Sequence, residues 1–143
     1  MALWVKKVLC GFVFLLAAAQ SQRVDYPGPV CAVRGSSVSL LCTFSPAESS
    51  LPGGEEVTRV LWCQNHLICH GSTPTVYDSQ ERNNNNNPRY RYRGDQRGRC
   101  SLQISDVRRE DDSTLRFRME AKDPRASFTG QAGVGVSVVG KTV

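Results

Sequence analysis

The stretch Leu115-Arg116-Phe117-Arg118-Met119-Glu120 alternates apolar and charged side chains without a break. Successive side chains of a β-strand point to opposite faces, so an alternation of period two predicts a strand that is buried on one side. We expect the three apolar side chains to face a core and the three charged ones to face solvent. No part of the sequence after its N-terminal segment predicts a helix longer than one turn. This stretch therefore favours an all-β fold.

Shorter runs of the same kind surround this stretch. They are rich in Val, Leu, Ile and Cys, and segments containing Pro, Gly, Ser and Asn separate them. Short alternating runs broken by turn residues are typical of a β-sandwich or a β-barrel. Strands are expected at residues 38–44, 57–63, 67–70, 100–104 and 134–138, with Asn65 and His66 at a hairpin tip.

The N-terminal segment Met1–Gln22 has the pattern of a secretory signal peptide. Lys6 and Lys7 precede an apolar run of about 11 residues, which is shorter than the roughly 20 residues that cross a bilayer. No second apolar stretch of membrane length follows. We therefore expect a signal peptide at residues 1–22 and one domain at 23–143. The product would be secreted or extracellular, or it would be the first domain of a longer receptor.

The size and charge of the chain exclude several function classes. Its 143 residues fit one ordinary domain and are too few for a barrel enzyme. The only two histidines, His66 and His70, each lie within three residues of a cysteine. Asp111 and Asp112 are adjacent, so their side chains would diverge and would suit a turn better than acid–base chemistry. We expect no enzyme activity and no cofactor.

The cysteines favour disulfides. In a secreted small domain cysteines usually pair, and five remain once the signal peptide is removed, so one stays unpaired or bonds elsewhere. The spacing Cys63-x2-His66-x2-Cys69-His70 also permits a metal cluster. For a secreted chain we prefer a disulfide to zinc at this position and expect no metal. The five cysteines are Cys31, Cys42, Cys63, Cys69 and Cys100.

The order of these features resembles an immunoglobulin V-type domain. The markers are Cys42 on an early strand, Trp62 on the next, and Asp106-Val107-x4-Asp112-Ser113 before a late strand. The resemblance implies a two-sheet sandwich with a core tryptophan. The late strand departs from the usual pattern, because Leu115 and Phe117 occupy the positions of the usual tyrosine and second cysteine. The usual bridge between the sheets is therefore not expected.

Two stretches resemble the siglecs, the sialic-acid-binding immunoglobulin-type lectins. They are Arg99-Cys100-Ser101-Leu102-Gln103-Ile104-Ser105-Asp106-Val107 and the late-strand segment from Asp111 to Glu120. The resemblance implies a disulfide between Cys42 and Cys100 within one sheet. It also places Arg118 where the family's arginine grips the carboxylate of sialic acid. The chain departs from the family at Arg116, where an aromatic residue is usual.

A separate feature resembles the polymeric immunoglobulin receptor and its relatives. Those proteins carry an extra bridge across the central hairpin that begins at a Trp-Cys pair like Trp62-Cys63. The resemblance implies a Cys63–Cys69 disulfide, which leaves Cys31 without a partner in this chain.

Arg118 and three further residues form the candidate ligand site. A guanidinium matches a carboxylate with two parallel hydrogen bonds, and sialic acid is distinguished by its carboxylate. Arg116 would reinforce or crowd that contact, and the resemblance suggests that Phe128 and Tyr26 stack on the sugar. The partner would be a sialylated glycan or glycoprotein. The alternatives are an Arg118 that is only salt-bridged to Glu120 or Asp111, and a V-type domain whose front sheet binds a protein.

A basic segment adds one further possibility. On a strand, Arg89, Arg91 and Arg93 would share one face and attract a polysulfated glycan, although a solvated outer face is the default interpretation. Nucleic acid is not an expected partner of a secreted chain with so modest a charge. The arginines are Arg89, Arg91, Arg93, Arg97 and Arg99.

Overall fold

The structure is a computed structural model that describes residues 23–46, 49–70, 74–81 and 86–140. The expected signal peptide lies outside the described residues. The described chain forms strands and two single 3-10 turns, η1 (Arg109–Asp111) and η2 (Pro124–Ala126). The strands are β1 (Arg23–Asp25), β2 (Val30–Val33), β3 (Val38–Leu40), β4 (Thr43–Ser45), β5 (Val57–Gln64), β6 (Thr75–Asp78), β7 (Tyr90–Tyr92), β8 (Leu102–Ile104), β9 (Ser113–Ala121), β10 (Phe128–Thr129) and β11 (Val134–Val139).

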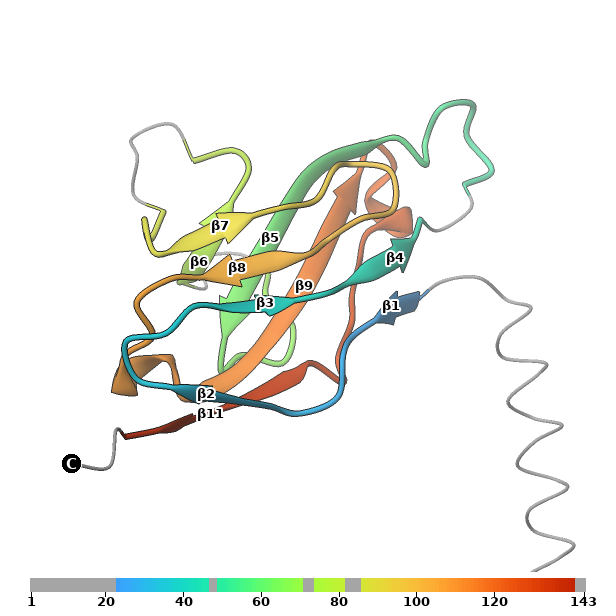
Figure 1. Cartoon of the computed structure of the whole chain (residues 1–143). Coiled ribbons are helices and arrows are strands. Elements are labelled where there is room, and N and C mark those ends of the chain that lie inside the picture. Colours follow the sequence, from blue (N-terminus) through green and yellow to red (C-terminus); the bar gives the residue numbers. More distant parts are fainter. Residues whose placement is uncertain (1–22, 47–48, 71–73, 82–85, 141–143) are drawn as a thin grey trace, which may run out of the picture.

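These strands form a two-layer sandwich (Figure 1). The front sheet has the order β2-β11-β9-β5-β6, and the short β10 pairs with β9. The back sheet has the order β3-β8-β7, and the ribbon of β1 and β4 continues from it because β4 follows β3 in the chain. All pairs are antiparallel except β11 with β2. The expected all-β sandwich is confirmed.

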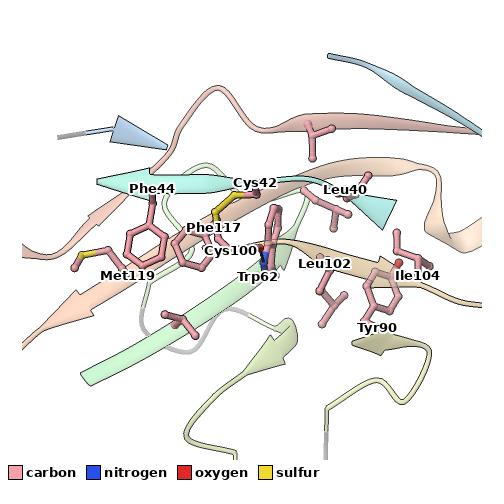
Figure 2. Close-up of a cluster of buried hydrophobic side chains, with 14 of the residues drawn as sticks. Leu40, Cys42, Phe44, Trp62, Tyr90, Cys100, Leu102, Ile104, Phe117 and Met119 are labelled. Carbon is pink, nitrogen blue, oxygen red and sulfur yellow. Dashed lines mark hydrogen bonds between the residues drawn. A yellow bond between two sulfur atoms is a disulfide. The ribbon is translucent and has the colours of Figure 1, made fainter. Parts of the chain in front are cut away.

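The core lies between the two sheets and is built around Trp62 of β5 and Phe117 of β9. Both are fully buried, and their ring centroids lie 5.6 Å apart. Phe117 also contacts Phe44 of the back layer, at 5.0 Å between ring centroids. Figure 2 shows these rings beside the sulfurs of Cys42 and Cys100. An aromatic ring at position 117 therefore fills the space where the resemblance to V-type domains would place a bridging cysteine.

The disulfides join the pairs that the two resemblances implied. Cys42 and Cys100 are bonded, and the backbone N–H of Cys100 donates to the carbonyl of Cys42 at 2.9 Å. Both cysteines therefore lie side by side in the back layer, and their disulfide does not cross to the front sheet. The second disulfide joins Cys63 and Cys69, so neither sulfur is available as a thiolate ligand. Cys31 is free and exposed on β2.

The alternation around position 117 predicts the buried face of β9 correctly. Leu115, Phe117 and Met119 are all fully buried. The expected strand at 67–70 is wrong, because these residues form a bent loop and the hairpin partner of β5 is β6. The bend follows from Asn65 and Cys69, whose φ angles of 56° and 61° lie in the left-handed region that a strand cannot contain.

Asp111 closes the base of the sandwich, as its turn position suggested. Its carboxylate is 1% exposed and accepts hydrogen bonds from both terminal nitrogens of Arg89, at 2.6 and 2.9 Å. The hydroxyl of Tyr90 and the backbone N–H of Arg108 donate to it as well, at 2.6 and 2.7 Å. Burial alone would raise the pKa of this carboxyl, but these hydrogen bonds hold the pKa below its ordinary value.

Candidate functional site

The charged side chains of β9, Arg116, Arg118 and Glu120, lie on the outer face of the front sheet. In the register of the sheet, Arg118 lies between Leu61 of β5 and Thr129 of β10. Its Nε donates to Glu120 at 3.1 Å, and its Nη1 donates to the hydroxyl of Thr129 at 3.1 Å. Within the described residues, Nη2 of Arg118 has no hydrogen-bond partner. The guanidinium thus points away from the core and keeps one donor nitrogen available.

The exposure of Arg118 is lower than expected for an outward strand residue. Only 12% of its side chain is accessible, because Thr129 and Glu120 stand on either side of it. Glu120 is itself shared, since its other carboxylate oxygen accepts from Arg59 of β5 at 3.3 Å. Arg59 therefore competes with Arg118 for the negative charge of Glu120.

Arg59 and Asp78 complete a row of charges across β9, β5 and β6. The Nε of Arg59 donates to Asp78 at 2.9 Å, and Nη2 donates to the second oxygen of the same carboxylate. Burial would raise the pKa of Asp78, but the Arg59 hydrogen bonds and the backbone N–H of Gln80 lower it below its ordinary value. The row Arg118, Glu120, Arg59 and Asp78 thus holds two positive and two negative charges.

Arg116 adds a positive charge that no acid neutralises among the described residues. Its Nε donates to the carbonyl of Gln131 at 2.7 Å, and its Nη1 donates to the carbonyl of His66 at 3.4 Å. Residues two apart on one strand lie about 6.5–7 Å apart on the same face. Arg116 and Arg118 therefore form a cationic pair at one end of the charged row, where an anion would be attracted.

The loop from Asn65 to His70 lies against this face. Leu61, Cys63 and Cys69 form a small second core on the outer side of β5, and the Cys63–Cys69 disulfide holds the loop there. The loop is also tied to the site, because the Thr129 hydroxyl donates to the carbonyl of Ile68. The loop therefore forms one wall beside the two arginines.

Tyr26 and Phe128 occupy different surroundings from Arg118. Phe128 pairs with Met119 and packs against the main core. The Tyr26 hydroxyl donates to the carbonyl of Gly130 at 2.7 Å and accepts from the backbone N–H of Phe117 at 2.8 Å. Burial raises the pKa of Tyr26 to about 12. Both rings support the β9–β10 segment from the core side, and their role in sugar stacking stays a prediction.

The sequence reasoning did not single out Arg59, Asp78 or Thr129. A signal for Arg59 was present, since it alternates with Val60 and Trp62 on a strand whose apolar face is buried. Asp78 and Thr129 gave no comparable signal. Their roles depend on the pairing of β6 with β5 and of β10 with β9, which a single sequence does not specify.

Comparison with known protein families identifies the class. Residues 25–139 match the immunoglobulin V-set domain, so the chain belongs to the immunoglobulin V-set family. No curated protein matches the chain. Domains of this family are generally recognition modules rather than enzymes. Among the described residues, no helix is long and apolar enough to span a membrane.

Proposed function

We propose that the chain is an extracellular recognition domain of siglec type, which binds sialylated glycans through Arg118. The observation that carries this proposal is the pair Arg116 and Arg118 on the outer face of β9, with a single shared acid, Glu120, beside it. The disulfide within the back layer and the aromatic ring at position 117 support the same subtype. Secretion by a signal peptide at residues 1–22 is part of the proposal.

The chemistry follows from the partners of Arg118. A sialic acid carboxylate would bind Nη2 and replace Glu120 at Nε, while Glu120 keeps its ion pair with Arg59. The Thr129 hydroxyl would hold the guanidinium in place from the other side. A charged hydrogen-bonded contact contributes roughly 1.5–3 kcal/mol. A single shallow contact of this kind gives a dissociation constant on the order of millimolar, so useful binding depends on clustered glycans.

Replacement of Arg118 tests the proposal. We expect Arg118→Ala to weaken binding to a multivalent sialoside surface by about 10- to 150-fold, from the loss of roughly 1.5–3 kcal/mol. Arg118→Lys keeps the charge but loses the planar fork, and should retain only part of the binding. The measurement is a sialylated-glycan array probed with the clustered domain. Parent protein that binds no sialoside, or that binds equally well after Arg118→Ala, contradicts the proposal.

Glu120 provides the converse prediction. We expect Glu120→Gln to tighten sialoside binding about two- to fivefold, because a partly exposed ion pair of about 0.5–1 kcal/mol no longer competes for Arg118. Thr58→Ala, on the neighbouring strand β5, is the control and should leave affinity unchanged. Equilibrium titration against a clustered sialoside measures the effect. A weaker Glu120→Gln variant would show that the carboxylate positions Arg118 instead of competing for it.

A second candidate function rests on the loop beside the arginines. Leu67 and Ile68 are 61% and 53% exposed on a segment fixed by a disulfide, and exposed apolar side chains on a rigid loop favour a protein ligand. Binding to cells before and after sialidase treatment separates the two functions. Binding that survives sialidase and Arg118→Ala, and is lost in Leu67→Ser/Ile68→Ser, supports the protein ligand.

A further inference from the structure

The outer face of the back sheet presents a row of arginines on the opposite side of the sandwich from Arg118. Tyr90 and Tyr92 point toward the core, so Arg91 and Arg93 point outward, and both are exposed. Arg93 lies beside Ser101 in the β7–β8 hairpin, and the exposed Arg99 precedes Ser101 by two residues on the same face. Neighbouring arginines in this row are therefore about 6.5–8 Å apart.

The residues beside Arg91 and Arg93 are neutral, whereas Arg99 lies opposite Asp95 in the hairpin. Arg91 pairs in register with Gln103, which in turn pairs with Ser39 of β3. The guanidinium of Arg93 donates twice to the side-chain oxygen of Gln103, at 3.1 and 2.9 Å. Among the described residues, no acid forms an ion pair with Arg91, Arg93 or Arg99.

The two remaining arginines of the segment differ from the row. The positive charge of Arg89 is neutralised by its ion pair with Asp111. Arg97 lines a cavity together with the acids Glu55 and Glu56. The basic character of this segment therefore concentrates on Arg91, Arg93 and Arg99.

The hairpin that carries the row is held rigidly. Asp95 accepts hydrogen bonds from the backbone N–H groups of Arg97, Gly98 and Arg99, at 2.8 to 2.9 Å. The Tyr92 ring packs over Gly94, where an added Cβ would lie 2.6 Å from it, so no larger residue fits without a shift. A rigid array loses little conformational entropy when it binds a ligand. The carboxylate of Asp95 is engaged by the turn, which limits its effect on the row.

An aromatic cavity adjoins the same arginines. Its volume is about 420 Å³, and Tyr77, Tyr90, Tyr92, Pro88, Arg91 and Arg93 contribute to its lining. The rings of Tyr77 and Tyr92 are stacked, with centroids 4.9 Å apart. Aromatic faces pack well against the apolar faces of sugar rings, whereas guanidinium groups bind sulfate oxygens. Arg91 and Arg93 contribute to the lining of this cavity, so the cavity and part of the arginine row adjoin.

We propose that this hairpin binds a sulfated linear polysaccharide, with Arg91, Arg93 and Arg99 contacting its sulfate groups and the tyrosine cavity receiving a sugar ring. A regularly spaced row of cations with no paired acid suits a linear polyanion better than a single small anion. The rival basic cavity, lined by Arg34, Arg108 and Arg109, is less suited because Asp106 pairs with Arg108 at 3.2 Å. The site is separate from the proposed sialoside site.

The test measures binding of the domain to immobilised heparin over a series of salt concentrations. We expect Arg91→Gln/Arg93→Gln/Arg99→Gln to weaken binding at least about tenfold at physiological salt and to reduce the salt dependence, since three charged contacts are lost. The control Arg34→Gln/Arg108→Gln/Arg109→Gln removes the same charge at the rival cavity and should change binding less than about threefold. The single variants Arg91→Gln and Arg99→Gln give the same comparison should the triple variant fail to fold.

Several results would overturn this proposal. Equal losses in the two triple variants would indicate a bulk charge effect, and a larger loss in the control would move the site to the rival cavity. If single-stranded DNA of matched charge binds as tightly as heparin, the hairpin recognises polyanions in general and not sulfated polysaccharides. Arg118→Ala should leave heparin binding intact, and the back-sheet variants should leave sialoside binding intact. Failure of either proposal is thus distinguishable from failure of the other.

Discussion

Replacement of both Cys42 and Cys100 by alanine is expected to lower the free energy of unfolding by about 4 kcal/mol. The disulfide closes a loop with a sequence separation of 58, and the chain-entropy model assigns about 4 kcal/mol to a loop of that length. This is a large share of the roughly 5–15 kcal/mol that stabilises a small domain. Urea unfolding of both proteins, followed by tryptophan fluorescence of the buried Trp62, measures the difference.

The matched control is Cys63→Ala/Cys69→Ala. This disulfide has a sequence separation of only 6, so the same model assigns it about 2 kcal/mol. The order of the two losses is the informative result. A smaller loss for Cys42→Ala/Cys100→Ala than for the control would show that the back-layer disulfide contributes little to stability. Peptide mapping without reduction, which should link Cys42 to Cys100, verifies the pairing independently.

Loss of the Asp111 carboxylate is expected to cost about 3–5 kcal/mol of stability. Asp111→Ala leaves the Arg89 guanidinium, whose side chain is 12% exposed, with only the exposed Glu110 at 3.3 Å as an acid partner, and a poorly paired buried charge is costly. Replacement of both partners, in Arg89→Met/Asp111→Leu, should recover much of the loss because no unpaired charge remains. Chemical unfolding of the three variants gives the comparison. A double variant less stable than Asp111→Ala would contradict this explanation.

The same carboxylate predicts a pH dependence. The pKa of Asp111 is lower in the folded protein than its ordinary value, so the folded state favours the charged form. Its contribution is therefore present above the unfolded pKa of about 3.9 and is lost as the pH falls through the lower folded pKa. Parent protein should lose stability over this acidic range more steeply than Arg89→Met/Asp111→Leu. Parallel losses in the two proteins would exclude Asp111 as the cause.

Local patterns in the sequence were sufficient for the parts of the fold that depend on one strand at a time. The alternation from Leu115 to Glu120 gave both faces of β9, and Val134 to Val138 gave the closing strand. The region from Leu67 to His70 was predicted wrongly as a strand because its apolar residues resemble one in composition. Its conformation is set instead by the Cys63–Cys69 disulfide and by the left-handed residues at its ends, which are tertiary and backbone effects.

For the candidate site, too, the sequence predicted what depends on one strand and missed what depends on strand pairing. The outward direction of Arg118 followed from period-two alternation, but its low exposure did not, because Thr129 arrives from a later strand. The ion pair of Glu120 with Arg59 likewise needs the register between β9 and β5. Sequence alone thus identified the charged groups of this face, whereas the pairing that partly neutralises them required the structure.

The position of the two disulfides has a mechanical consequence. The closed loops span residues 42–100 and 63–69, so β9, β10 and β11 all lie outside them. Tension applied at β11 would therefore meet only hydrogen bonds and side-chain packing before it reached Arg118. Under such a force β9, β10 and β11, which carry the candidate site, would separate from the sandwich while the Cys42–Cys100 disulfide still held the back layer together.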